Sequence, residues 1–508
     1  MDGRLLLDVS DAEILKGKAG VVAATTARFQ DFAVSALDSK AAEIAARIRK
    51  RDQQLARLRD ENPQPKLWKK FDTPNFGAGR NVRFGDLDGD GVPDMLIAQN
   101  IPRNHRDTFD QISCLTAVTL DGKVLWQKGR PDPRNGLLTN DTPFQIHDID
   151  GDGHNEVIVV RDFHLQILDG RTGEIRNSVL MPNIPDTDKE RPIKTDTTDS
   201  PAYRAALQNT DTLYRPYENE VGDNILFVNF SGNPARHEIL VKDRYMHFWI
   251  YNNKLELLWK ADSPPGHYPY PFDINGDGFD ELLAGATLWD HTGHQIWSND
   301  AEKFPNADSV MMGNLSADTK AEPRVYESCA DQGFLMFDIH GKLLKHLRVG
   351  FNQSASVGKY RMDIPGLQYI SVNFWRSPGI VTLFDWDGNI LSQEEPIHSG
   401  SELLPVNWRG DGQEFVLLNG NTREGGMIDG RFQRVVMFPD DGHPDLAAAV
   451  LNVTGDPRDE IILWDQQRVW IYTQDRPFTG HRIYNPIRNP DYNDSNYRTD
   501  VSSRGGSM

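Results

Sequence analysis

Short apolar runs separated by polar turns recur along most of the chain. The clearest runs are DMLIAQ from Asp94, EVIVVRD from Glu156 and ELLAGA from Glu281, and each follows directly on an acidic, glycine-containing loop. Runs of four to eight residues that are rich in Val, Ile and Leu and bounded by turn residues are typical of short strands. The chain is therefore predicted to be all-β over most of its length.

A second pattern follows most of these runs: an apolar segment, a tight turn centred on Asp-Gly or Asn-Asn, and another apolar segment. Examples are LTAVTLDGKVLWQ, LQILDGRTGEIRN, MHFWIYNNKLELLWK, FLMFDIHGKLLKHL and VTLFDWDGNILSQ. Such residue pairs favour the backbone angles of hairpin turns. Each repeat thus supplies a strand and a hairpin in addition to its loop.

The acidic loops form an internal repeat. Nearly the same text, DLDGDGVPD, DIDGDGHNE and DINGDGFDE, begins at Asp86, Asp148 and Asp273, and weaker copies begin near residues 229, 314, 363, 407 and 452. The commonest spacing is about 44 residues, which is a usual length for one propeller blade. Eight loops, each with a strand and a hairpin, predict an eight-bladed β-propeller, with seven blades as the second choice.

Residues 10–61 differ from the rest, because they are rich in Ala, Glu, Lys, Arg and Leu and contain no proline. This composition favours helices, and we expect two. A basic recognition surface is one reading of the second helix. The other is an amphipathic helix that docks on the propeller or on a second copy of the chain through one face, formed by Ile44, Ile48, Leu55 and Leu58.

The segment ENPQP at 61–65 ends the helical part. We therefore divide the chain into a helical N-terminal arm (1–65), a propeller (66–495) and a flexible C-terminal tail (496–508). Two long intervals between loops hold insertions, at roughly 100–112 and 180–225. Loops of this length in a repeat protein usually carry function or are disordered.

Composition narrows the class of protein further. The chain has 508 residues, is 38% hydrophobic and 25% charged, and contains no apolar stretch near the ~18 residues of a membrane span. A formal net charge of -19 repels a phosphate backbone and argues against nucleic-acid binding. The two cysteines, Cys114 and Cys329, form no CxxC pair, so zinc ribbons and disulfide frameworks have no support, while a single bridge stays open.

The three complete loops have the donor pattern of a calcium site. Oxygen side chains at loop positions 1, 3 and 5, a main-chain carbonyl at position 7 and a carboxylate at position 9 can surround Ca²⁺, which takes 6 to 8 oxygen ligands. An EF-hand is disfavoured, because strands rather than helices follow the loops. We regard the bound ions as structural. The predicted ligands are Asp86, Asp88, Asp90 and Asp94, then Asp148, Asp150, Asp152 and Glu156, then Asp273, Asn275, Asp277 and Glu281.

These loops, together with the closing text DPRDEIILWDQQRVWIYTQDRPFTGHRIYNPIRNPDYN, resemble the propeller-type rhamnogalacturonan lyases over residues ~70–495. After Tyr492 the sequence departs from the family's asparagine- and proline-rich ending. The resemblance implies a polysaccharide lyase with an acidic rhamnose- and uronate-containing glycan as partner. It also implies an extracellular or periplasmic location, although the first residues lack the features of a secretory signal. Homo-oligomers through the N-terminal helices are a further expectation.

Lyases of this kind cleave beside a uronic acid by β-elimination. The reaction needs a cation against the carboxylate, a base for the adjacent ring proton and an acid for the leaving oxygen. The strongest local cluster is Arg103, His105 and Arg106, on the insertion that follows the first loop. A histidine can accept the proton and arginines can pair with a carboxylate. A surface loop is the structural alternative.

Other candidate residues are more scattered. Arg376 lies beside Trp375, a pairing suited to a sugar face and a charge. The resemblance singles out Tyr492, at the end of NPDY, as the counterpart of the family's aspartate-proline-x-tyrosine motif. Packing and blade closure are the respective alternatives. For His147, directly before the second loop, we expect a structural hydrogen bond rather than catalysis.

Two other function classes stay open. Acidic repeats also occur in non-catalytic propellers that bind glycan or protein in a calcium-dependent way, and fold alone does not separate these from lyases. A glycoside hydrolase would need two carboxylates at a defined separation, which the many loop acids conceal.

Overall fold

The computed structural model describes residues 37–102, 110–137, 141–184, 219–264, 266–299, 304, 306–374, 379–396, 402–445, 447–481 and 497–502. The chain divides into two units, residues 1–57 and 58–508, which we describe separately. The described part of the first unit consists of helix α1 (Asp38–Glu61), whose last residues belong to the second unit and which has no buried residue. Of the two predicted helices, the first lies outside the described residues.

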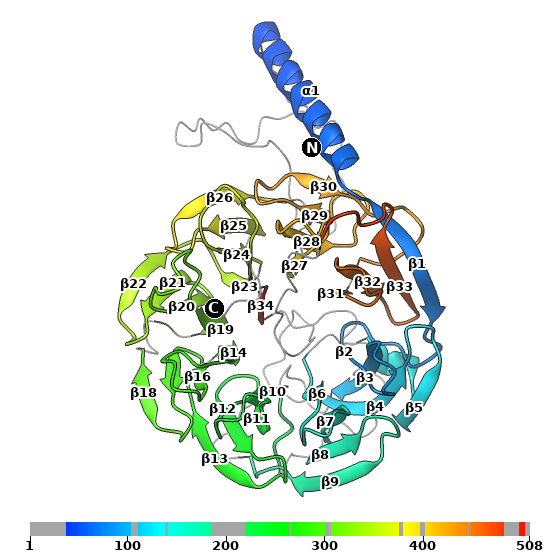
Figure 1. The fold of residues 1–508 in the computed structure, drawn as a ribbon, viewed down its shortest axis with the longest axis vertical. Coiled ribbons are helices and arrows are strands. Elements are labelled where there is room, and N and C mark those ends of the chain that lie inside the picture. Colours follow the sequence, from blue (N-terminus) through cyan, green and yellow to red (C-terminus); the bar gives the residue numbers. More distant parts are fainter. Residues whose placement is uncertain are drawn as a thin grey trace, which may run out of the picture. The chain divides into compact units, whose positions relative to one another are not determined.

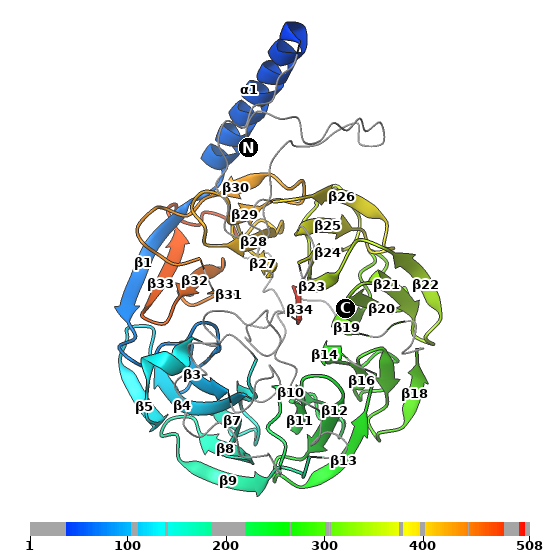
Figure 2. The same ribbon diagram turned by 180° about the vertical axis from the view of Figure 1, so that it is seen from behind.

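The second unit contains eight sheets, and in seven of them four antiparallel strands follow one another in the order of the chain. Figures 1 and 2 show them as a ring of blades around a central axis. This confirms the predicted eight-bladed β-propeller, and the seven-bladed alternative has no support. No helix among the described residues is long and apolar enough to cross a membrane.

The first four complete blades follow one another along the chain. Their strands are β2 (Val82–Gly85), β3 (Asp94–Pro102), β4 (Asp110–Val118) and β5 (Val124–Gly129); β6 (Phe144–His147), β7 (Glu156–Arg161), β8 (His164–Asp169) and β9 (Ile175–Leu180); β10 (Asn224–Val228), β11 (Glu238–Lys242), β12 (His247–Tyr251) and β13 (Leu257–Asp262); and β15 (Tyr270–Phe272), β16 (Glu281–Ala284), β17 (Thr287–Trp289) and β18 (Gln295–Ser298). A short 3-10 helix, Pro133–Gly136, stands between β5 and β6.

The remaining blades complete the ring. Their strands are β19 (Ala307–Gly313), β20 (Arg324–Cys329), β21 (Gly333–Asp338) and β22 (Leu343–Leu347); β23 (Asn352–Gly358), β24 (Gln368–Asn373), β25 (Ile380–Phe384) and β26 (Ile390–Glu394); β27 (Leu404–Val406), β28 (Phe415–Asn419), β29 (Gly426–Ile428) and β30 (Arg434–Val436); and β31 (Ala447–Leu451), β32 (Glu460–Trp464) and β33 (Arg468–Gln474).

The last blade takes its outer strand from the other end of the propeller sequence. Strand β1 (Pro65–Asp72) pairs antiparallel with β33, from Pro65 opposite Gln474 to Asp72 opposite Arg468. The N-terminal and C-terminal parts of the propeller are thereby hydrogen-bonded in one sheet, which closes the ring.

Two short strands add parallel pairs to this scheme. Strand β14 (Gly266–Tyr268) pairs with β19, and β34 (Thr499–Val501) pairs with β23 near the axis (Figure 1). Residues 496–508 were expected to form a flexible tail, but Thr499 and Val501 are buried. The difference arises because a parallel pairing of three residues leaves no local pattern in the sequence.

Apolar clusters fill the spaces between neighbouring blades. Leu96 and Leu115 of one blade, for example, pack with Phe144 and Val157 of the next. Shortening such a buried side chain to alanine costs about 2 to 5 kcal/mol, so these contacts between blades stabilise the ring. Both cysteines are buried and free, so the single bridge left open by the sequence does not form.

The two ends of the blades differ in what they carry. All eight repeated loops join the innermost strand of a blade to its second strand, as between β2 and β3 or β6 and β7. Because the strands are antiparallel, the hairpin turns lie at this same end, which we call the loop face. The innermost strands begin at the opposite end, the entry face.

Candidate functional site

The first complete loop is shaped by its own aspartates. The Asp86 carboxylate accepts the N–H groups of Gly89 and Gly91 at 2.6 and 2.9 Å, and Asp94 accepts that of Leu87 at 2.9 Å. Both glycines have a φ of +84°, a conformation that a side chain would strain. The turn therefore folds through side-chain to main-chain bonds that repeat at the same positions in the loops from Asp148 and Asp273.

Carboxylates gather in these loops closely enough to share a cation. In the first loop, ligand oxygens of Asp86, Asp88 and Asp90 lie within 4.8 Å of one another. In the second, those of Asp148, Asp150 and Glu156 do so. Hard oxygen donors at such spacing suit Ca²⁺.

In each complete loop, the last carboxylate is buried close to other negative charges. Burial raises the pKa of Asp94 to about 6 and the pKa values of Glu156 and Glu281 to about 7, and neighbouring loop aspartates add to the shift. A cation between the carboxylates would favour their charged forms. In the second loop Arg176 supplies part of that charge, with its guanidinium 2.6 Å from Glu156 and 3.6 Å from Asp150.

The repeated loops also join neighbouring blades. Asn155, at the eighth position of its loop, donates its amide to the carbonyl of Asp86 in the previous blade at 2.8 Å. At the same loop position, the carboxylates of Asp280 and Asp459 instead accept the main-chain N–H groups of Asn229 and Asn407 in the previous blade. His147, the last residue before the second loop, has its Nε2 at hydrogen-bond distance from the carbonyls of Ala235 and Arg236, at 3.1 and 2.9 Å.

A second group of polar residues lies at the entry face, close to the axis. It consists of residues at the starts of innermost strands, the end of β11 and the segment before β34. We call it the axial cluster: Arg80, Asp141, Asp223, Lys242, Arg244, His267, Asp308 and Tyr497.

Ion pairs and a ring stack connect the axial cluster. Arg244 lies 3.3 Å from Asp223 and donates to the Tyr497 hydroxyl at 3.1 Å. The Tyr497 ring stacks on the imidazole of His267, with centroids 3.8 Å apart. His267 Nε2 lies 3.4 Å from Asp308. Arg80 forms a buried ion pair with Asp141 beside them.

Burial sets the protonation states within this cluster. It lowers the pKa of His267 well below the usual value, and the positive charges of Arg244 and Lys242 act in the same direction. The imidazole is therefore neutral near pH 7. Burial also lowers the pKa of Lys242 to about 8 and raises that of Tyr497 to about 12. A neutral base, cations and a protonated phenol thus lie together.

The catalytic residues predicted from sequence, Arg103, His105, Arg106, Arg376 and Tyr492, lie outside the described residues. The strands that flank the first four are described: β3 and β4 pair at Pro102 and Asp110, and β24 and β25 pair at Asn373 and Ile380. Both pairs end at the entry face.

Sequence reasoning missed the axial cluster. Its members lack a common motif, but most stand just before or at the start of an innermost strand, as Arg80, Asp141 and Asp308 do. Once eight blades are predicted, charged residues at those positions are expected to converge on the axis. That positional signal could have identified part of the cluster.

The fold and the axial cluster define an eight-bladed β-propeller with buried charged residues close to its axis. No protein-family model matches the chain. The chain is similar to the rhamnogalacturonan exolyase YesX of Bacillus subtilis, with 24% identity over 82% of this chain and 74% of the relative. It is also similar to the rhamnogalacturonan endolyase YesW of the same organism, with 23% identity over 82% and 70%. The predicted resemblance to propeller-type rhamnogalacturonan lyases is confirmed.

Solved structures show the same fold. The crystal structure of YesW matches with a TM-score of 0.60 at 18% identity, covering 88% of this chain and 82% of that one. The biofilm matrix protein Bap1 of V. cholerae matches with a TM-score of 0.54 at 14% identity, covering 85% of this chain and 94% of that one. The architecture therefore occurs in lyases and in a matrix protein.

Proposed function

We propose that the chain is a polysaccharide lyase that cleaves an acidic, rhamnose- and uronate-containing glycan by β-elimination. Its similarity to two rhamnogalacturonan lyases supports the reaction class. The observation that carries the proposal is the axial cluster, in which a neutral imidazole, two cationic side chains and a protonated phenol are packed together.

Each requirement of β-elimination has a candidate in this cluster. The carboxylate of the uronate would pair with Arg244 and Lys242, which makes the adjacent ring proton more acidic. His267, held neutral, would accept that proton, and the Tyr497 hydroxyl would donate one to the departing oxygen. General acid–base steps of this kind contribute about 10² to 10⁴-fold each.

The residues predicted from sequence remain candidates for contacts with the glycan. The connection between β3 and β4 contains Arg103, His105 and Arg106, and the connection between β24 and β25 contains Arg376. In both cases the flanking strands end at the entry face. Tyr492 precedes the segment that brings Tyr497 to the axis. Their proposed roles are to bind the uronate carboxylate and to assist proton transfer.

We also propose that the three complete loops bind structural Ca²⁺. The donor set fits: clustered carboxylates, a main-chain carbonyl at position 7 and a last carboxylate whose pKa is raised by burial. The ions would lie at the loop face, away from the axial cluster. They would hold neighbouring blades in register, because the same loops carry the bonds between blades.

The test is the ultraviolet absorbance of the unsaturated uronate that β-elimination leaves. The protein is incubated with rhamnogalacturonan, ulvan and a rhamnose-capped glucuronate glycan. His267→Gln and Tyr497→Phe should each lower the rate about 10² to 10⁴-fold. His237→Gln, which replaces a half-buried histidine bonded to Ile149 at the loop face, is the control and should keep the rate.

A second function, a non-catalytic glycan- or protein-binding propeller, is favoured by one observation. His267 is 5% exposed, Lys242 is fully buried, and the ring of Tyr497 covers the imidazole. A polar core that only stabilises the ring would have the same burial. Absence of any absorbance rise on all three glycans, with a folded protein, would favour this second function.

A further inference from the structure

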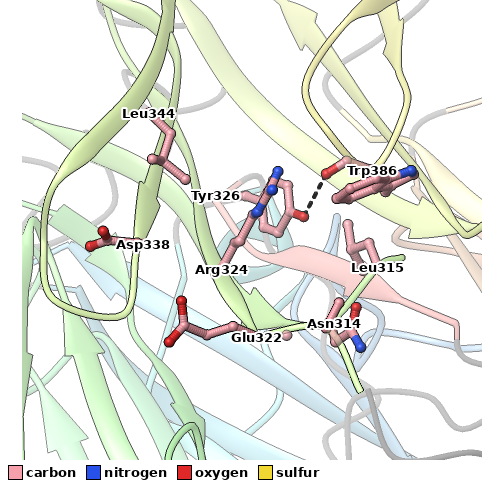
Figure 3. A pocket seen from close by; sticks show the side chains of 10 residues that line it. Asn314, Leu315, Glu322, Arg324, Tyr326, Asp338, Leu344 and Trp386 are labelled. Atoms are coloured by element: carbon pink, nitrogen blue, oxygen red, sulfur yellow. Dashed lines mark hydrogen bonds between the residues drawn. The ribbon is translucent and has the colours of Figure 1, made fainter. Parts of the chain in front are cut away.

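A separate pocket of about 300 Å³ opens where the blade β19–β22 meets the blade β23–β26. It lies at the loop face, around the weak repeat that begins at Asn314. Figure 3 shows Arg324 and Tyr326 near its middle, with Asp338 and Trp386 at opposite ends. The lining residues are Gly313, Asn314, Leu315, Ala321, Glu322, Arg324, Tyr326, Asp338, Leu344 and Trp386.

The pocket lies at the loop from Asn314, where a cationic side chain stands at the position of the last carboxylate of the complete loops. Arg324 stands opposite Gly313 in the sheet, as Asp94 stands opposite Gly85 in the first blade. An arginine thus replaces the last carboxylate of the complete loops. A guanidinium at this position excludes Ca²⁺ and leaves the space to another kind of ligand.

Arg324 is held in place by the next blade. Its guanidinium lies 2.6 Å from the carboxylate of Asp387 and 4.8 Å from the centre of the Trp386 ring. The Tyr326 hydroxyl donates to the Trp386 carbonyl at 2.8 Å. The wall that carries the tryptophan is therefore preorganised, and Asp387 is shared between Arg324 and Lys345, whose ammonium lies 3.9 Å from it.

The remaining polar groups are acceptors. Within the described part of the chain, the exposed carboxylate of Glu322 makes no hydrogen bond or ion pair. One oxygen of Asp338 accepts the N–H groups of His340 and Lys342, and the other is unengaged there. Apolar surface comes from Leu315, Leu344 and Trp386. Carboxylates that accept hydroxyl protons, beside an aromatic and aliphatic wall, match the two sides of a sugar ring.

Charge decides which sugar fits. The three carboxylates Asp387, Glu322 and Asp338 outnumber the two cations Arg324 and Lys345, so the pocket is negative and the carboxylate of a uronate would be repelled. The volume is at the small end of the ~300–1,000 Å³ range of ligand sites, which suits one or two sugar rings. We propose that this pocket is an accessory binding site for a neutral pyranose. The choice of L-rhamnose as its ligand rests on the proposed function.

The test is saturation-transfer NMR of the full chain with L-rhamnose, methyl rhamnoside and galacturonate. Rhamnose and its glycoside should give signals that Trp386→Ala and Glu322→Gln each weaken about 10-fold or more. Galacturonate, which the axial cluster is proposed to bind, should give the same signal in the parent and in both variants. Unchanged rhamnose signals in both variants, or an equal loss of the galacturonate signal, would overturn the proposal.

Two controls match these variants. Trp68→Ala removes another partly exposed tryptophan that has a cation, Lys69, 4.4 Å from its ring centre, and Glu394→Gln removes an exposed carboxylate on β26. Both should bind rhamnose as the parent does. If Trp386→Ala fails to fold, Glu322→Gln decides, because that side chain is exposed and without described contacts.

Lyase activity separates this proposal from the function proposed above. Trp386→Ala should leave the release of unsaturated uronate from a short glycan unchanged, because the axial cluster lies at the other end of the blades. Rhamnose binding without any lyase activity would contradict the proposed function only. Lyase activity without rhamnose binding would contradict the accessory site only.

Discussion

The loop at Asp148 and the loop at Asn452 have the same backbone plan but balance the charge of their last carboxylate differently. In the loop at Asn452, the hydroxyl of Thr454 donates to Glu460 at 2.8 Å. In the loop at Asp148, the aspartate Asp150 stands in place of that threonine, so a like charge faces Glu156. One loop is complete within the protein, and the other has an excess of negative charge that a cation would balance.

In two other degenerate loops, an arginine stands where the complete loops have a carboxylate or an amide. In the loop at Asn407, Arg409 stands at the third position and pairs with Asp411 at 2.7 Å. In the loop at Asn314, Arg324 stands at the last position and pairs with Asp387. In these three degenerate loops, a hydroxyl or a guanidinium thus stands where the complete loops are proposed to use Ca²⁺.

The largest expected effect is that of a chelator on the whole propeller. Removal of Ca²⁺ should lower the melting temperature, because a ligand present at 100 times its Kd contributes about 2.7 kcal/mol per site. Calorimetry in chelator, in Ca²⁺ and in Mg²⁺ checks this, with Mg²⁺ as the control for ionic strength. An identical melting curve in chelator and in Ca²⁺ would falsify the structural-calcium proposal.

A single complete loop should account for a part of that effect. Asp150→Asn removes a charged donor and should abolish about one site's share of the calcium-dependent stabilisation, roughly 2 to 3 kcal/mol. The measurement is the difference in unfolding free energy between Ca²⁺ and chelator. A variant that keeps the parent's full calcium response would show that this loop binds no ion.

The matched change in a degenerate loop should behave differently. Thr454→Val removes the hydrogen bond to Glu460 and leaves a buried carboxylate oxygen without it, which costs about 1 to 3 kcal/mol. The loss should be the same with Ca²⁺ and with chelator. A loss that appears only in Ca²⁺ would indicate that the loop at Asn452 also binds the ion.

The smallest effect concerns pH in the absence of calcium. Burial raises the folded-state pKa values of Glu156 and Glu281 to about 7, above those of the unfolded chain. The folded protein then binds more protons, so this contribution to stability is present below the unfolded pKa and is lost as pH rises through about 7. In chelator, the melting temperature should fall between pH 5.5 and 8. In Ca²⁺ the fall should be smaller, because binding favours the charged carboxylates.

Local pattern explains which parts of the molecule were predictable. Each acidic loop, its strand and its Asp-Gly hairpin are encoded within one repeat, so the eight blades follow from the sequence. The end of helix α1 follows from the proline-containing segment at 61–65. The axial cluster is different, because Arg80, Asp223, His267 and Asp308 come from separate blades and meet only when the ring closes. Strands β14 and β34 are short parallel additions, and no repeat encodes them.

The pairing of β1 with β33 has a consequence for synthesis on the ribosome. Strand β1 is synthesised first, but its partner β33 lies in the last blade. The sheet that contains both strands therefore cannot form until nearly the whole propeller has been synthesised. Until then, the edges of β1 and of each newly made blade expose unpaired backbone groups that favour association with other chains. A nascent or truncated chain is therefore expected to depend on chaperones. In the finished ring, β1 and β33 are paired with each other.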